Sequence, residues 1–127
     1  MGFVVAFLKR NDRYHEWAVG LANQVSESLL TCDAVLAEAA FQVQNCSLVL
    51  NLIQERLLLP AFVIVENLSH LTELARRYAD RNPDLADLCL VRLSELHPRH
   101  SVITVDVEDF RIYRRNRRQP IPIISPL

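Results

Sequence analysis

The segment from residue 82 to residue 110, NPDLADLCLVRLSELHPRHSVITVDVEDF, constrains the fold more than any other part of the chain. Apolar residues recur at helical spacing from Leu85 to Leu96, and Asn82 and Pro83 suit a helix cap and a first helical position. The HPRH sequence that follows disfavours further helix, and the β-branched run over residues 101–105 favours a strand. The segment therefore predicts a helix, a turn and a strand in succession.

Acidic residues stand at the start and at the end of this predicted unit. Asp84 and Asp87 are three residues apart, so they share one face of the helix, and Asp106 follows the strand. Because ligands in open α/β sheets bind beyond the carboxyl ends of the strands, we expect these carboxylates to converge. Convergent like charges repel unless a cation lies between them, and hard oxygen ligands suit Mg²⁺ or Mn²⁺. The alternative is that Asp84 and Asp87 only favour the helix N-terminus, and that Asp106 is an ordinary turn residue.

The rest of the chain alternates between helical and strand patterns. Helices are predicted after Asn11 or Asp12, through AVLAEAAFQV after a cap at Thr31 or Asp33, and over residues 47–59 and 68–79. Strands are predicted over residues 28–32 and 61–65 and, exposed, around residue 112, with the tail QPIPIISPL as an extended arm. This alternation predicts an α/β fold with a mostly parallel sheet, formed as one domain over residues 1–127.

Composition excludes several classes of protein. The net charge of −1 provides no global field toward nucleic acid or a membrane surface, and no apolar run is long enough to cross a bilayer. Cys32, Cys46 and Cys89 are odd in number and form no CxxC pair, so we expect reduced thiols in the cytoplasm.

Glu38 lies within the predicted helix AVLAEAAFQV, and its environment has two interpretations. Its neighbours three and four positions away include Ala34, Val35 and Phe41, and a carboxylate beside such groups is costly unless it is paired or bound to a metal. Alternatively, Glu38 belongs to a solvent-facing stripe with Gln42 and Asn45.

Several catalytic patterns are missing from the sequence. It contains neither a P-loop nor GxGxxG, its histidines and cysteines do not have zinc-binding spacing, and no serine lies in GxSxG. Metal-assisted hydrolysis is therefore the enzyme class that remains.

Four segments, in this order, resemble the PIN-domain family and, within it, the VapC-type toxins of bacterial toxin–antitoxin pairs. They are AFLKRNDRYHEWA, LLTCDAVLAEAAF, ARRYADRNPDLADLCLV and VITVDVEDFRIYR. The resemblance implies a three-layer α/β/α fold around a parallel sheet and a magnesium-dependent endoribonuclease, with RNA as substrate, a small antitoxin protein as partner and a homodimer. It also implies that the catalytic acids are Glu38, Asp87 and Asp106, with Asp84 as a further metal ligand and Asp109 as a supporting acid.

The sequence departs from the family pattern at its start. The family opens with a strand that ends in Asp-Thr and is followed by a short apolar helix like GFVVAFL, and here Met1 stands in place of the threonine. The first strand and its aspartate would therefore lie upstream, which leaves either a start assigned too late or a degenerate domain. We accordingly expect a ribonuclease whose activity is impaired, with a catalytically inactive RNA- or protein-binding domain as the alternative. A metal-sensing or phospho-receiver domain is disfavoured because no suitable lysine follows a late strand.

A basic cluster follows the acids near the end of the chain. We predict that Tyr113 stacks on bases and that five arginines contact RNA phosphates, namely Arg111, Arg114, Arg115, Arg117 and Arg118. The alternative is a charged sheet edge that prevents pairing with another sheet.

Overall fold

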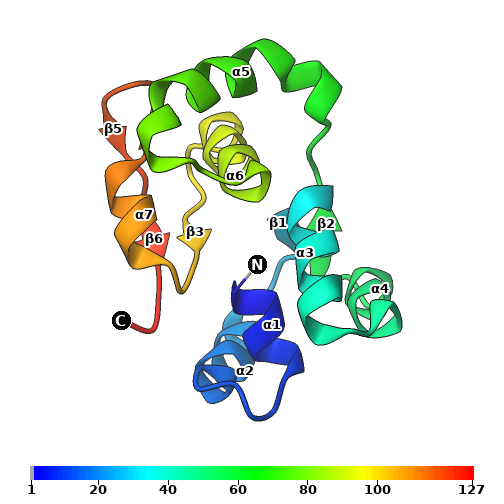
Figure 1. Cartoon of the computed structure of the whole chain (residues 1–127). Helices are drawn as coiled ribbons and strands as arrows, with labels where there is room; N and C mark the ends of the chain where they lie inside the picture. The colour runs from blue at the N-terminus through cyan, green and yellow to red at the C-terminus, as the bar shows by residue number, and fades with distance from the viewer. Residues whose placement is uncertain (1) are drawn as a thin grey trace. The chain divides into compact units, whose positions relative to one another are not determined.

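The computed structural model describes residues 2–127, and these form two compact units, which we describe separately (Figure 1). The first unit contains residues up to 61 together with residues 126–127, and the second contains residues 62–125. The expectation of a single domain stays a prediction.

The first unit begins with two helices that pack on each other, α1 (Gly2–Leu8) and α2 (His15–Gln24). The ring of Phe3 meets that of Trp17 edge to face, with 6.1 Å between centroids, and Nδ1 of His15 lies 2.8 Å from the carbonyl oxygen of Ala6. Helix α2 begins three residues after Asp12, whose Oδ1 accepts a hydrogen bond of 2.9 Å from the N–H of Tyr14. Asp12 thus stabilises the turn before the helix and does not cap the helix itself.

The remainder of the first unit is built around two short parallel strands. Strand β1 (Leu29–Thr31) pairs with β2 (Leu58–Pro60), and helices α3 (Asp33–Val43) and α4 (Cys46–Gln54) lie between them in the chain. Parallel strands need such a helical crossover connection. Three expectations were wrong here: neither Thr31 nor Asp33 caps α3, the helix predicted over residues 47–59 ends at Gln54, and residues 61–65 form no strand.

The early end of α4 has a local cause. Arg56 adopts a left-handed backbone conformation, with φ at 67°, and the N–H of Leu57 returns to the carbonyl oxygen of Leu52 at 3.0 Å. A left-handed residue of this kind ends a helix. The apolar residues after the turn therefore continue in an extended conformation and form β2. The apolar run therefore contains a helix and a strand, which hydrophobicity alone does not separate.

The second unit is helix-rich. It contains the 3₁₀ helices η1 (Ile64–Asn67) and η2 (Ala79–Arg81) and the α-helices α5 (Leu68–Arg77), α6 (Leu85–Leu96) and α7 (Val107–Ile112). Strand β3 (Val102–Ile103) pairs in parallel with β6 (Ile123–Ile124), and β4 (Arg114–Arg115) pairs with β5 (Gln119–Pro120) as an antiparallel hairpin. Helix α5 packs on α6, as Figure 1 shows.

Helix α7 corrects one expectation about the end of the chain, and strand β6 shows what the extended tail pairs with. Ile112 ends a helix and is not in an exposed strand, because Asp106 caps the six residues that follow it. The proline-containing tail pairs with β3, since the N–H of Val102 donates to the carbonyl oxygen of Pro122 at 2.8 Å. The predicted α/β class with parallel strands is confirmed. None of the helices in residues 2–127 is long and apolar enough to span a membrane.

Candidate active site

Asp84 and Asp87 occupy the beginning of helix α6. Oδ1 of Asp84 accepts a hydrogen bond of 2.8 Å from the N–H of Asp87, so Asp84 is the N-cap. Asn82, which the sequence favoured as the cap, instead ends η2 in a left-handed conformation with φ at 48°. The cap leaves Asp87 in the first turn of α6, with its side chain half-buried.

Asp106 and Asp109 are brought together by the short connection from β3 to α7. The N–H of Asp106 donates to Oγ1 of Thr104 at 2.8 Å, which fixes the turn after β3. Asp106 then caps α7, and its Oδ1 lies 3.4 Å from the N–H of Asp109. Asp106 and Asp109 therefore lie on the same side of the first turn of α7.

The two helix starts meet, and three carboxylates converge. One carboxylate oxygen from each of Asp87, Asp106 and Asp109 lies within 4.8 Å of the other two. Oxygen atoms at this spacing suit a divalent cation, which takes carboxylate ligands at about 2.0–2.6 Å. The sequence placed Asp109 as a supporting acid, and the structure places it within the cluster itself. Below, we call these three residues the aspartate cluster.

Electrostatics within the cluster are unfavourable when no cation is present. Burial, followed by the charges of Asp84, Asp106 and Asp109, raises the pKa of Asp87 to about 7. Burial is also the main reason that the pKa of Asp106 is raised. Near neutral pH, Asp87 therefore exists in both protonation states, and a cation among the carboxylates would favour the ionised state.

Tyr113 closes one side of this site. Its hydroxyl group donates to Oδ2 of Asp87 across 3.4 Å, and its ring packs edge to face on Tyr78 and Phe110. Burial and the charge of Asp87 raise the pKa of the Tyr113 hydroxyl group, so it stays protonated as a donor. The ring of Tyr113 is only 1% exposed, which corrects the expectation that it stacks on RNA bases.

Arg81 is a site residue that the sequence analysis missed. Its Nη2 lies 2.9 Å from Oδ1 of Asp109, and this ion pair lowers the pKa of Asp109. The two residues are 28 positions apart, so no local pattern could pair them. The aspartate cluster therefore carries a fixed positive charge on one side.

Comparison with protein families agrees with this geometry. A family model described as the PIN domain matches residues 2–116, which is most of the chain. The chain belongs to the PIN domain family. Membership indicates a nuclease-like function. A comparison with curated proteins gave no match.

Glu38, the remaining acid expected in this PIN domain, lies on α3 in the first unit. Its side chain is half-buried and lines a hollow with Ala37, Phe41 and Gln42. Phe41 is 83% exposed, so the surroundings of Glu38 are open to solvent on that side. Convergence of Glu38 with the aspartate cluster stays a prediction.

The predicted arginine cluster of the PIN domain divides into exposed and buried members. Arg111, Arg117 and Arg118 are exposed, and Arg114 is half-buried. Arg115 is only 4% exposed, and its Nη1 donates to the carbonyl oxygen of Ser94 at 3.3 Å. Arg115 is therefore removed from the predicted RNA contacts, because its guanidinium group lies inside the second unit.

Proposed function

We propose that this PIN domain is a metal-dependent endoribonuclease and the toxin component of a toxin–antitoxin pair. The observation that supports this proposal most strongly is the aspartate cluster, in which three carboxylates approach one another and the pKa of Asp87 is about 7. Such a cluster is unfavourable alone and favourable around a divalent cation.

Mg²⁺ or Mn²⁺ fits these residues, since the ligands are hard carboxylate oxygens. Asp87, Asp106 and Asp109 would hold the cation, with Glu38 and Asp84 as further ligands. A divalent cation, when bound, activates water and offsets charge on a phosphodiester. Within the protein, the hydroxyl group of Tyr113 orients the carboxylate of Asp87, and Arg81 does the same for Asp109.

RNA is the substrate in this proposal. The exposed guanidinium groups of Arg111, Arg117 and Arg118 lie in the same unit as the aspartate cluster, and the half-buried Arg114 lies among them. Arginine side chains contact the phosphates of single-stranded nucleic acid without sequence preference, which suits an endonuclease that holds its substrate by the backbone.

An antitoxin would act on the same acids. Carboxylates that converge on a cation also attract a guanidinium group, and Arg81 already makes such a contact with Asp109 within the chain. In the first unit, Phe41 and Leu50 are 83% and 62% exposed and provide apolar surface for an antitoxin or a second copy of the chain.

Cleavage of a labelled single-stranded RNA tests the proposed activity. We expect cleavage that requires Mn²⁺ or Mg²⁺, and we expect Asp87→Asn to lower the rate by about a hundredfold or more, since misplaced ligands misplace the attacking water. Asp80→Asn is the matched control, because Asp80 is exposed and outside the aspartate cluster. Cleavage that persists in chelator, or that Asp87→Asn leaves unchanged, would contradict the proposal.

Thermal unfolding gives a second measurement that does not depend on activity. We expect Mn²⁺ to raise the melting temperature by binding the folded state, and Asp106→Asn to abolish that rise while raising the metal-free melting temperature. Metal binding without any RNA cleavage would favour the alternative of a catalytically inactive RNA- or protein-binding domain.

A further inference from the structure

The hairpin of β4 and β5 presents two of the exposed arginines at its turn. Strand pairing joins Arg114 to Pro120 and Arg115 to Gln119, which leaves residues 116–118 as the connection, here called the arginine turn. Asn116 and Arg117 both have left-handed backbone conformations, with φ at 50° and 71°. Asparagine tolerates this conformation, which is common in hairpin turns, but it is unfavourable for an arginine, so contacts from the rest of the unit help to maintain the turn.

Glu95 of α6 supplies one such contact. Its Oε2 accepts a hydrogen bond of 2.6 Å from the backbone N–H of Asn116. Its Oε1 lies 3.1 Å from Nη1 of Arg92, and the side chain of Glu95 is only 9% exposed. The acceptor for Asn116 is therefore a largely buried carboxylate that an ion pair holds in place.

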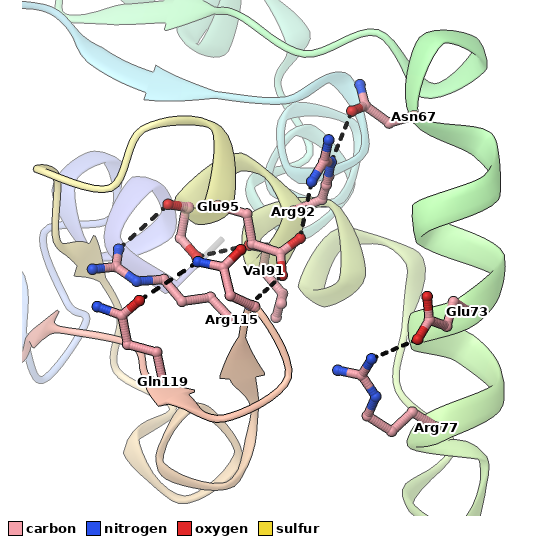
Figure 2. Close-up of polar contacts among 10 residues, drawn as sticks. Asn67, Glu73, Arg77, Val91, Arg92, Glu95, Arg115 and Gln119 are labelled. Carbon is pink, nitrogen blue, oxygen red and sulfur yellow. Dashed lines mark hydrogen bonds and ion pairs between the residues drawn. The ribbon is translucent and has the colours of Figure 1, made fainter.

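This arrangement continues into the interior of the second unit, as Figure 2 shows. Nε of Arg92 donates to Oδ1 of Asn67 at 2.9 Å, and Nδ2 of Asn67 donates to the carbonyl oxygen of Val63 at 3.0 Å. Asn67 is only 8% exposed. Glu95 thus connects the arginine turn, through Arg92, to the buried side chain of Asn67. These hydrogen bonds restrict the rotamers of Glu95.

Glu73 of α5 contacts the same turn in a different manner. Its Oε1 lies 3.1 Å from Nη2 of Arg117, and the side chain of Glu73 is 42% exposed. The same oxygen accepts from Nη2 of Arg77 at 2.7 Å, and these arginines, Arg77 first, lower the pKa of Glu73. Glu95 therefore holds the backbone of the turn, whereas Glu73 occupies a guanidinium group that would otherwise be available to a phosphate.

We propose that Glu95 positions the arginine turn for the RNA backbone and that Glu73 competes with RNA phosphate for Arg117. This inference depends on the proposed function, because it assumes that the turn contacts RNA. Glu73 and Glu95 each place one negative charge near the turn. By charge alone, loss of either glutamate should strengthen RNA binding. The proposed roles instead predict that loss of Glu73 strengthens RNA binding and that loss of Glu95 weakens it.

The experiment measures binding of a labelled single-stranded RNA in chelator, over a series of salt concentrations. Glu73→Ala should lower the Kd and increase the salt slope by about 0.7, the value for one additional phosphate contact on a single strand. Glu95→Ala should raise the Kd and decrease the slope, since the arginines of a loosened turn must be ordered on binding. Circular dichroism checks that each variant is folded at the temperature of the assay.

Two further variants make the outcome decisive. Glu95→Asp keeps the charge but is one methylene shorter, so it should also raise the Kd, and it replaces Glu95→Ala if that variant does not fold. Wild-type Kd values for the Glu95 variants, or weaker binding by Glu73→Ala, would overturn the inference. The double variant Arg117→Ser, Arg118→Ser tests the assumption separately. An unchanged salt slope in this variant would mean that the turn does not contact RNA, and the proposed RNA contact would fail with it.

Discussion

Within the aspartate cluster, Asp87 is the residue whose pKa is raised to about 7. Burial, followed by the charges of the neighbouring acids, raises this pKa and favours the protonated form, although the carboxyl group also receives a hydrogen bond from Tyr113. Asp109, only a few ångströms away, has the opposite shift, because Arg81 holds its pKa below the ordinary value. The immediate contacts of these two carboxylates therefore shift their pKa values in opposite directions, and shifted pKa values are common in catalytic sites.

The raised pKa of Asp87 predicts how stability depends on pH in metal-free buffer. The folded pKa of about 7 lies above the ordinary 3.8, so the folded state gains stability as the pH falls from 8 toward 4 and loses it as the pH rises through 7. The lowered pKa of Asp109 contributes only at more acidic pH. We expect a higher melting temperature at pH 5.5 than at pH 8, and a smaller difference in Asp87→Asn.

This comparison between wild type and variant removes the contribution of the ionisable groups that the two proteins share. Equal pH dependence in wild type and Asp87→Asn would show that Asp87 is already ionised at pH 5.5.

At the scale of elements, helix α6 both builds the site and holds the hairpin. Its first turn carries Asp84 and Asp87, and its last turns carry Ser94 and Glu95, which contact the hairpin at Arg115 and Asn116. The apolar side of the helix, including Val91 and Leu93, is buried between these ends. A rigid helix therefore connects the aspartate cluster with the arginine turn, and both depend on its position.

The cap of α6 provides a prediction at this scale. The pKa of Asp87 is raised by burial and then by neighbouring charges, of which that of Asp84 is the first. Asp84→Asn keeps a side-chain oxygen for the N–H of Asp87 but removes this charge, so stability at pH 8 should increase. Asp84→Ala relieves the same repulsion but loses the cap, and should be less stable than Asp84→Asn by about 1 kcal/mol. Urea unfolding of the three proteins without metal measures both effects, and equal stability of the two variants would show that the cap contributes nothing.

At the scale of the whole molecule, the exposed apolar side chains of α3 and α4 predict association. Phe41, Leu48 and Leu50 are at least 40% exposed, and exposed large apolar side chains, where they form one patch, mark surfaces that a partner covers. We expect the protein to co-purify with a small antitoxin from native cells and to form a homodimer when it is produced alone.

Light scattering measures the mass in solution, and Leu50→Glu should shift a dimer toward monomer. The matched control is Asn51→Glu, an exposed neighbour on α4 that is already polar. A monomeric wild type together with no recovered partner would contradict this prediction.

The sequence by itself determined the local features of the site. Helical spacing and an acidic first turn placed Asp84 and Asp87 at the start of α6, and a β-branched run placed Asp106 after β3. These features depend on residues that are close in the chain, so composition and periodicity reveal them. The same patterns identified most helices, although an apolar run concealed the boundary between α4 and β2.

Only the tertiary structure decided which side chains meet. The pairing of Arg81 with Asp109 joins η2 to α7, and the burial of Arg115 depends on how the hairpin packs on α6. From the sequence, Arg115 is equivalent to Arg114 and Arg117, because five arginines within eight residues carry no signal for which of them faces inward. That selection is made by packing between segments far apart in the chain, which places the carbonyl oxygen of Ser94 beside Nη1 of Arg115 and so offsets part of the cost of burying its charge.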